Sequence, residues 1–226
     1  MRIKNREIIA LKKRLKKEGI KGLALDVDET LSFTIGYMVG ELMKTFGNPE
    51  NLTAEEIARK YKHTKKIPYW QGDECKKLLK KIIMGNELQK TMPLIENSNL
   101  LANKLTKIIP ISAYITARPR TILNGTIFWL KKHGFPKATI ITRTDGVYKK
   151  DANQWKAKVL EYLYPEIQGI VDDNPDLVKY LSKTYKGVVF LYDNTKTERK
   201  DIKVIPCENW KDVLVAVKDE FSGDHD

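Results

Sequence analysis

Short apolar runs alternate with amphipathic segments along much of the chain. Five apolar runs have the length and composition of buried strands, at 21–27, 109–116, 138–142, 167–171 and 188–192. Apolar residues at helical spacing predict helices before and between them, over 5–18, 96–107, 119–133, 152–163, 175–185 and 208–220. Strands that alternate with helices indicate right-handed crossovers, so we expect an α/β fold with a Rossmann-like, three-layer parallel sheet.

This rhythm is interrupted between residues 33 and 95, where helical patterns dominate and no convincing strand is present. Thr53 and Glu56 have the spacing of a capping box, and Leu78, Leu79 and Ile82 follow at helical spacing. We therefore predict a catalytic core of residues 1–32 and 96–226 and an inserted all-helical segment, residues 33–95, called the cap below.

The amino-acid composition indicates the kind of ligand that the protein attracts but does not identify its function. The chain of 226 residues has 41 lysines and arginines against 29 aspartates and glutamates, a formal charge of +12 that favours anionic ligands. Phosphate esters, nucleic acid and anionic lipid all fit that charge, and lysine-rich helical segments are also common as plain solvated faces.

The two cysteines, Cys75 and Cys207, are far apart and match no zinc or disulfide pattern. No signal peptide and no membrane-length apolar run is evident, so we expect a cytoplasmic protein without a membrane partner. Nothing in the sequence fixes the oligomeric state.

The polar residues that follow the predicted strands carry the candidate chemistry. Ligands bind beyond the carboxyl ends of the strands in open parallel sheets. Those ends carry Asp26 with Asp28, Thr116 with Arg118, Arg143 with Thr144, and Asp172 with Asp173. Carboxylates gathered at one poorly solvated edge repel one another unless a cation lies between them, and Mg²⁺ prefers such oxygen ligands.

A phosphoryl oxygen could bind at Thr116, near Arg118 and the N-terminus of a helix that we expect Pro119 to open. A lysine is needed to balance the charge, and the sequence offers Lys149, Lys150, Lys156 and Lys158 as candidates. Taken one at a time, these residues could have purely structural roles, because strand-end aspartates also form turns and helix caps. A calcium loop is excluded, since Leu31 stands where that loop needs glycine and Tyr37 where it needs glutamate.

Four stretches together resemble the motifs of the haloacid dehalogenase superfamily, in the order that this family has them. They are the DVDET run from Asp26, the YITAR run ending at Arg118, a lysine-bearing helix, and the VDDN run ending at Asn174. The resemblance extends from about residue 21 to residue 192, and the helical insert matches the family's cap position. It implies Mg²⁺-dependent phosphoryl transfer through an aspartyl-phosphate.

The resemblance also implies a role for each matching residue. Asp26 would be the nucleophile and a metal ligand, and Asp28 the general acid and base with its backbone carbonyl on the metal. Thr116 would hold the phosphoryl group, with Arg118 and Lys150 as further substrate contacts. Lys156 would be the charge-neutralising lysine, although Lys150 or Lys158 could serve instead. Asp173 would be a metal ligand, and Asp172 would support either the metal or the lysine.

The predicted function is hydrolysis of a phosphomonoester, on a small molecule, a nucleotide or a nucleic-acid end. The last choice comes from the net charge and from residues 141–151, which are loosely similar to polynucleotide 3′-phosphatase domains and to acid phosphatases. Transfer to an acceptor other than water, as in the family's mutases, stays open. So does a non-catalytic nucleic-acid-binding protein, since basic and aromatic residues alternate over 59–70, although ordinary packing of the cap more often produces this pattern.

Overall fold

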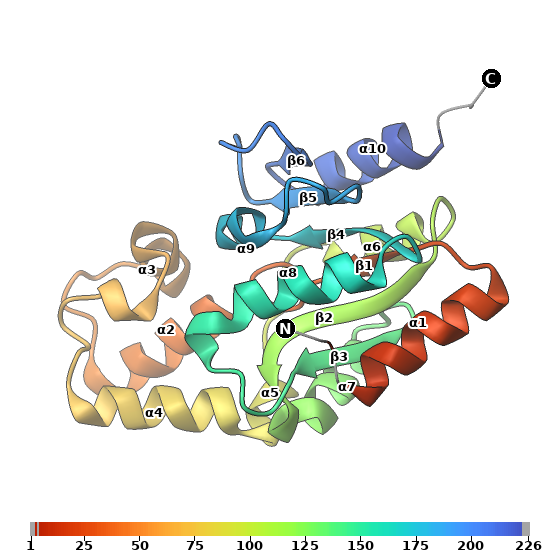
Figure 1. Cartoon of the computed structure of the whole chain (residues 1–226). Helices are drawn as coiled ribbons and strands as arrows, with labels where there is room; N and C mark the ends of the chain where they lie inside the picture. The colour runs from red at the N-terminus through yellow and green to blue at the C-terminus, as the bar shows by residue number, and fades with distance from the viewer. Residues whose placement is uncertain (1–2, 4, 223–226) are drawn as a thin grey trace.

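The computed structural model describes residue 3 and residues 5–222 and contains a six-stranded sheet at its centre (Figure 1). All neighbouring strands in it are parallel, in the order β3-β2-β1-β4-β5-β6. The strands are β1 (Gly22–Leu25), β2 (Ile111–Pro119), β3 (Thr139–Arg143), β4 (Ile167–Asp172), β5 (Val188–Tyr192) and β6 (Lys203–Cys207). The predicted Rossmann-like α/β fold is confirmed.

Helices cover both faces of the sheet. One face packs against α6 (Ser98–Leu105), α7 (Leu123–Lys132) and α10 (Trp210–Phe221). The other face packs against α1 (Arg6–Glu18), α8 (Ala152–Leu163) and α9 (Pro175–Tyr180). Strand β1 contributes to both, because Leu23 and Leu25 point to the first face and Ala24 to the second. In the part of the chain that is described, no helix is both long and apolar enough to cross a membrane.

Helix α1 shows how local sequence sets the ends of an element. The Asn5 side chain accepts hydrogen bonds from the amides of Glu7 (2.9 Å) and Ile8 (3.3 Å), which caps the helix N-terminus. Gly19 ends the helix with φ of 65°, a conformation that favours glycine. The helix predicted from its apolar stripe is confirmed.

The cap contains α2 (Thr34–Phe46), α3 (Ala54–Tyr61), the short 3₁₀ helix η1 (Thr64–Lys66), α4 (Asp73–Met84) and α5 (Asn86–Gln89). Thr53 and Glu56 form the predicted capping box. A small apolar core, which includes Val39, Ile57 and Trp70, holds α2, α3 and η1 together. Ile82 and Met92, by contrast, pack into the main core. The cap boundaries of 33 and 95 stay a prediction.

The chain enters and leaves the cap at adjacent places. Ser32 and Leu94 form an isolated antiparallel bridge. The amide of Phe33 donates to the carbonyl of Pro93 (2.9 Å), and the amide of Ile95 donates to the carbonyl of Leu31 (2.8 Å). The two connections therefore form a short hydrogen-bonded pair beside the end of β1.

Three element predictions are wrong in part. Pro119 is the last residue of β2, where it pairs with Arg143, so the helix predicted from it begins at Arg120 as the 3₁₀ helix η2 (Arg120–Ile122) and continues as α7 from Leu123. Helix α9 ends at Tyr180 instead of 185. Strand β6 was not predicted at all, since Pro206 lies inside it and its apolar run is short.

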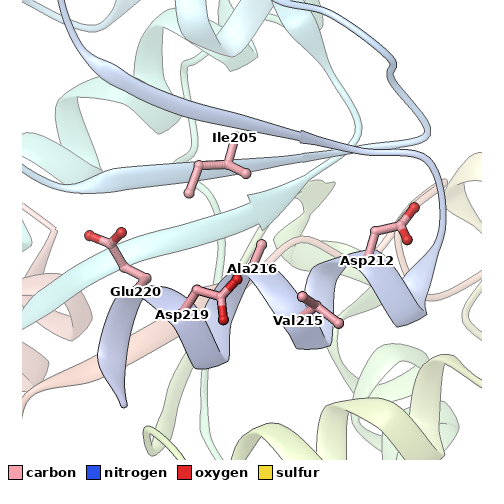
Figure 2. A pocket seen from close by; sticks show the side chains of 6 residues that line it. All are labelled: Ile205, Asp212, Val215, Ala216, Asp219 and Glu220. Atoms are coloured by element: carbon pink, nitrogen blue, oxygen red, sulfur yellow. The ribbon is translucent and has the colours of Figure 1, made fainter. Parts of the chain in front are cut away.

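Two surface cavities lie away from the strand ends that carry the carboxylates. One of about 340 Å³ is lined by Ile205 of β6 and by residues of α10, among them Asp212 and Glu220 (Figure 2). The other, of about 360 Å³, lies between Arg14 near the end of α1 and the starts of β2 and β3. Neither cavity contains a residue of the predicted site.

Candidate active site

The site residues lie where the sheet topology places them. Strand β1 lies between β2 and β4. The chain adds β2 and β3 on one side of β1 and then returns to add β4, β5 and β6 on the other side, so the order of the strands reverses between β1 and β4. Asp26 directly follows β1 and Asp172 ends β4, with the amide of Asp26 donating to the carbonyl of Val171 (2.9 Å). The two aspartates are thereby fixed side by side at the switch point of the sheet.

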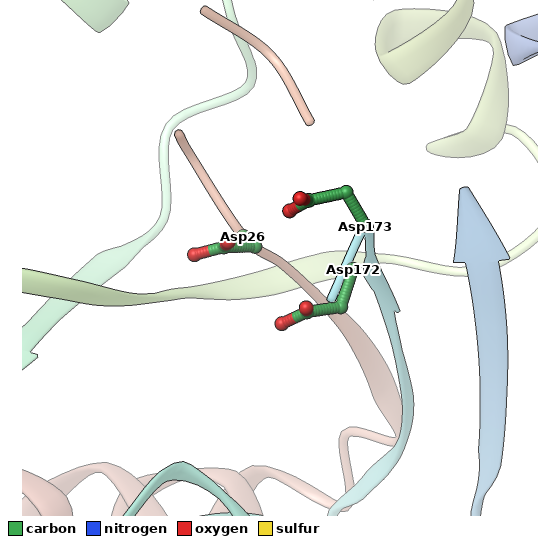
Figure 3. Close-up of side chains that lie close together, drawn as sticks. All are labelled: Asp26, Asp172 and Asp173. Atoms are coloured by element: carbon green, nitrogen blue, oxygen red, sulfur yellow. The ribbon is translucent and has the colours of Figure 1, made fainter. Parts of the chain in front are cut away.

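Three carboxylates converge at this point. Asp26, Asp172 and Asp173 each offer an oxygen, and these oxygens all lie within 4.8 Å of one another. Figure 3 shows the three side chains extending toward the same side from the ends of β1 and β4. Asp26 and Asp172 are buried and Asp173 is half-buried, so the group is largely shielded from water.

The charge state of these carboxylates fits a divalent cation. Burial raises the pKa of Asp26 to about 7, and the charges of Asp172 and Asp28 add to this, although Lys156 opposes it. Burial, with the charges of Asp172 and Asp26, raises the pKa of Asp173 well above its usual range. One buried oxygen of Asp26 has no hydrogen-bond donor. A hard cation would relieve both the repulsion and the missing partner.

Lys156 of α8 lies between two of the carboxylates. Its ammonium is 2.6 Å from Oδ2 of Asp172 and 3.0 Å from Oδ1 of Asp26, the second contact having ion-pair distance without hydrogen-bond geometry. Burial alone would lower the pKa of Lys156, but the carboxylates of Asp172 and Asp26 raise it above its usual value. The side chain therefore stays charged although it is only 2% exposed.

The other candidate lysines are placed differently. Lys150 is exposed, and its ammonium lies 5.9 Å from the centre of the Tyr148 ring. Lys158 is half-buried on α8 and makes no ion pair with a described residue. Lys149 is exposed at the start of the 3₁₀ helix η3 (Lys149–Asp151), and its charge helps to lower the pKa of Asp28. Geometry thus favours Lys156 as the neutralising lysine, while the roles of all four stay predictions.

Asp28 is held by an arginine from β2. Nε of Arg118 lies 3.0 Å from Oδ2 of Asp28, and Nη2 lies 2.8 Å from Oδ1. The hydroxyl of Thr34 donates to Oδ1 as well (2.6 Å). Burial would raise the pKa of Asp28, but the charge and hydrogen bonds of Arg118, with Thr34, lower it. Asp28 is therefore ionised at neutral pH in this arrangement.

Arg118 itself is fixed on its remaining sides. Its Nη1 donates to the hydroxyl of Thr126 (3.1 Å) and its Nη2 to that of Ser32 (3.1 Å), and the side chain is 4% exposed. The structure thus brings Arg118 to Asp28, while its predicted contact with substrate stays a prediction. Ser32 and Thr126 were not predicted, although Ser32 lies only two residues beyond the DVDET run.

Thr30 attaches the two aspartate loops to each other, and Asn194 holds the second of them from the end of β5. The Thr30 hydroxyl accepts from the amide of Asp173 (3.2 Å) and donates to its carboxylate (3.2 Å). Trp210 of α10 donates to the carbonyl of Thr30 (2.9 Å), and Asn194 donates to the carbonyl of Asp173 (3.0 Å). Asn194 follows β5 by two residues, and no pattern in the sequence marks it.

Glu29 connects the same loop to the cap. Its φ of 57° is unusual for a residue with a side chain, and its carboxylate accepts from the amide of Ile35 in the first turn of α2 (2.5 Å). Burial raises the pKa of Glu29 to about 8, against the hydrogen bonds from Ile35 and Thr34. The loop that carries Asp28 therefore also fixes the start of the cap.

Thr116 lies at the carboxyl-end region of β2 and is fully buried. Its hydroxyl accepts from the amide of Arg118 (3.2 Å). The expected helix begins one residue later and as a 3₁₀ turn, η2 (Arg120–Ile122), because the backbone stays extended through Pro119. A role for Thr116 in holding a phosphoryl group stays a prediction.

Comparison with known proteins connects this geometry to a fold family. The family model described as PITM 1-3, LNS2 domain, matches residues 109–172, which extend from β2 to the end of β4. The search of curated proteins gives no match. The crystal structure of a dehalogenase with an intermediate complex has a TM-score of 0.55 at 12% identity, covering 91% of this chain and 98% of the dehalogenase. A further dehalogenase crystal structure has a TM-score of 0.53 at 14% identity, covering 88% and 97%.

At these identities the likeness shows the fold. The chain has a haloacid dehalogenase-like fold, as the order of its motifs predicts. Within that fold it carries a cluster of three acidic residues that could hold a divalent cation.

Proposed function

We propose that this protein is a Mg²⁺-dependent phosphomonoester hydrolase that forms an aspartyl-phosphate. The observation that carries the proposal is the position of Asp26. It combines a buried oxygen that lacks a hydrogen-bond donor with a buried ammonium, that of Lys156, at 3.0 Å. A carboxylate without competing hydrogen-bond donors keeps its lone pairs for attack as a nucleophile, and the ammonium beside it favours a dianionic phosphate.

In the first step, a carboxylate oxygen of Asp26 attacks phosphorus, and the bond from phosphorus to the ester oxygen breaks. The ammonium of Lys156 lies beside the attacking carboxylate, where it compensates negative charge on the phosphoryl oxygens. The hydroxyl of Thr116 would hold one of those oxygens. The product of this step is a mixed anhydride on Asp26 and a free alcohol.

Asp28 handles protons in both steps. It gives a proton to the departing ester oxygen, and it then takes a proton from the water that attacks phosphorus and releases phosphate from Asp26. Arg118 keeps Asp28 ionised in the free protein, which suits the second step. The first step needs Asp28 in its protonated form, so Asp28 must take up a proton from water when the negatively charged phosphate binds beside it. Substrates with good leaving groups, which need this proton least, should react most easily.

Mg²⁺ is the cation that we assign to the acidic cluster. Asp26 and Asp173 would hold it, with Asp172 supporting both the cation and Lys156, and its charge would bind and neutralise the phosphoryl oxygens.

The substrate class proposed here is a phosphorylated small molecule, a nucleotide or a nucleic-acid end. The formal charge of +12 supports it, because the field of the whole protein attracts polyanions. Two free, buried cysteines accord with a reducing compartment, and a cytoplasmic location is part of the proposal.

Hydrolysis of an aryl phosphate with Mg²⁺ tests this function. We expect Asp26→Asn to lower kcat by about 10³-fold or more, because the nucleophile is lost. Thermal unfolding should show that the variant is folded. Asp73→Asn, which changes an exposed residue of α4, is the matched control and should keep wild-type activity. Absence of turnover by the wild type across a broad panel of phosphomonoesters would contradict the proposal.

The same assay separates the two alternatives. A phosphotransferase would phosphorylate an added alcohol or sugar phosphate in preference to releasing phosphate. A non-catalytic binding protein would bind oligonucleotides with strong salt dependence and show no turnover.

A further inference from the structure

The cavity of about 360 Å³ lies at the amino ends of β2 and β3. Its lining includes Arg14 and Leu15 from the second half of α1, a helix that runs beside β3 (Figure 1). Because the strands are parallel, the cavity is at the edge of the sheet opposite to the one that carries Asp26. A molecule bound there would leave the carboxylates of the candidate active site free.

Two cations line this cavity, and none of its described lining residues is acidic. Nη2 of Arg14 donates to the hydroxyl of Thr139 (3.3 Å), which connects α1 to the start of β3. Lys137 lies just before the same strand. Both cations are exposed, and within residues 5–222 neither makes an ion pair, whereas Lys12 of α1 pairs with Glu166 (3.6 Å). Their charges are therefore available to an anion.

Ser112 is a buried polar side chain in the lining of the cavity. The register of β1 and β2 shifts between Leu23 and Ala24, so that Ser112 is an extra residue in β2, as in a β-bulge. Gly22 leaves room for it, because a Cβ there would collide with the Ser112 hydroxyl. Ser112 is 7% exposed, and its hydroxyl makes no hydrogen bond with a described residue. Since a buried hydroxyl without a partner is unfavourable, a ligand in the cavity would supply the missing bond.

The rest of the lining is apolar. It consists of Leu15, Ile20, Pro110, Ile111 and Ala138. Small-molecule sites have volumes of about 300–1,000 Å³ and combine mainly apolar walls with a few polar groups that fix the orientation of the ligand. The cavity has this composition, so it suits an anion with an apolar part better than it suits inorganic phosphate.

We propose that this cavity is a second ligand site, which binds a small anion with an apolar body. The charged group of the ligand lies at Arg14, Lys137 and the hydroxyl of Ser112, and its body lies on Leu15 and Ile111. A carboxylate and a tetrahedral phosphate or sulfonate share this chemistry. The inference does not depend on the reaction proposed at Asp26.

Calorimetry with matched probes tests the chemical class. We would titrate the wild type, with a chelator present, with naphthalene-2-sulfonate, its neutral sulfonamide, methanesulfonate and 2-naphthoate. We expect naphthalene-2-sulfonate to bind at least about 10-fold more tightly than the sulfonamide, which lacks the charge, and than methanesulfonate, which lacks the ring. The naphthoate arm shows whether a planar or a tetrahedral anion fits better. Absence of binding by both aromatic anions, or equal affinity for the sulfonamide, would overturn the site.

Two variants locate the bound probe. Ser112→Ala should weaken binding of naphthalene-2-sulfonate by about 10-fold, because a hydrogen bond to a charged group is lost. Lys137→Gln should weaken it by about 3-fold, because this cation is exposed and water screens it. Lys186→Gln is the matched control, since it removes an exposed lysine just before β5, which is not next to β2 or β3. Unchanged affinity in Ser112→Ala, or equal losses in Lys137→Gln and Lys186→Gln, would overturn the site.

Thermal unfolding separates a binding role of Ser112 from a structural one. Its hydroxyl has no described partner, so Ser112→Ala should keep or raise Tm while it weakens binding of the probe. A lower Tm together with unchanged affinity would show that Ser112 only supports the sheet.

The candidate active site provides the last control. Asp26→Asn should bind naphthalene-2-sulfonate with the affinity of the wild type, because Asp26 lies at the other edge of the sheet. A changed affinity would place the probe at the strand ends that carry the carboxylates and would overturn the second site. The probe is not a phosphate ester, so this result is the same whether or not the protein hydrolyses phosphomonoesters.

Discussion

At the scale of single residues, burial and charge act together on the pair of Asp26 and Lys156. A buried carboxylate or ammonium is costly alone, but each reduces the cost of the other. Asp172 adds a second negative charge, so Lys156 is the only cation in contact with two buried acids among the described ion pairs. Removing it should therefore affect stability as well as chemistry.

Lys156→Met removes the shared cation and keeps an unbranched side chain of similar length. Asp26 and Asp172 then lose their partner, and we expect the metal-free variant to lose about 3–5 kcal/mol of unfolding free energy. Urea unfolding in the presence of a chelator measures this. Added Mg²⁺ should restore part of the loss, because the cation replaces some of the missing charge.

Lys179→Met is the matched control. Lys179 pairs with Asp176 at 2.7 Å, but both side chains are mostly exposed. Its removal should shift the unfolding midpoint little, because water screens such pairs. Equal losses in the two variants would show that burial is not what makes Lys156 important.

The gathering of the carboxylates could be predicted from sequence because periodicity decides where each strand ends, whereas the choice among Lys149, Lys150, Lys156 and Lys158 stayed open. Once a parallel sheet was expected, Asp26 and the Asp172–Asp173 pair had to share one edge. The pairing of Arg118 with Asp28 could not be predicted in this way. It depends on the path of the backbone beyond Thr116, which no side-chain pattern specifies.

At the scale of elements, the length and register of β2 determine the path of the backbone beyond Thr116. Its register with β3 shifts between Thr116 and Pro119, and the strand continues past Thr116 to Pro119, from which the sequence predicts a helix. This carries Arg118 forward to Asp28. Strand β6 was missed for a related reason, because a short edge strand tolerates Pro206 where a central strand would not.

The contact between α5 and α7 connects the cap to the core through a glycine. A Cβ added at Gly125 would lie 2.3 Å from the carbonyl oxygen of Asn86 and 2.9 Å from Cβ of Gln89. Gly125→Ala should therefore cost about 1–3 kcal/mol of unfolding free energy, because a backbone atom must move. Chemical unfolding followed by circular dichroism measures this.

Gly40 offers the opposite case. It lies within α2, and a Cβ there would meet nothing within 4 Å. Gly40→Ala should stabilise the protein by about 0.5–1 kcal/mol through helix propensity. Similar losses in both alanine variants would show that the α5–α7 approach is not tight.

At the scale of the whole molecule, an acidic site lies in a strongly basic protein. The formal charge of +12 attracts anions toward a centre whose own groups are mainly carboxylates. The basic protein as a whole attracts the anionic substrate, whereas the carboxylates of the site attract the cation. Binding of either one should therefore assist binding of the other. The field weakens with added salt, since screening at physiological ionic strength acts over about 8 Å.

The acidic cluster makes stability depend on pH and on Mg²⁺. Burial raises the pKa of Asp26 to about 7 and also raises that of Asp173, so the metal-free folded state binds protons more tightly than the unfolded chain. The resulting stabilisation is complete below about pH 4 and is lost as pH rises through about 7. Mg²⁺ competes with these protons. We expect saturating Mg²⁺ to raise Tm by about 5–10 °C at about pH 8 and far less at about pH 5.5.

Thermal unfolding with chelator or with Mg²⁺, at matched ionic strength, measures this shift. Asp173→Asn should lose most of it, and Asp73→Asn on the exposed face of α4 should keep it. A shift of equal size at both pH values would contradict the competition between protons and metal.

The paired connections at Ser32 and Leu94 have a consequence for how the chain can vary. The two ends of the cap lie together, so with respect to the core the cap is a closed loop. The entropic cost of closing a loop grows only with the logarithm of its length. Doubling the cap would cost the core only about 0.6 kcal/mol. The cap can therefore gain, lose or exchange residues during divergence, while the aspartates at the strand ends keep their places.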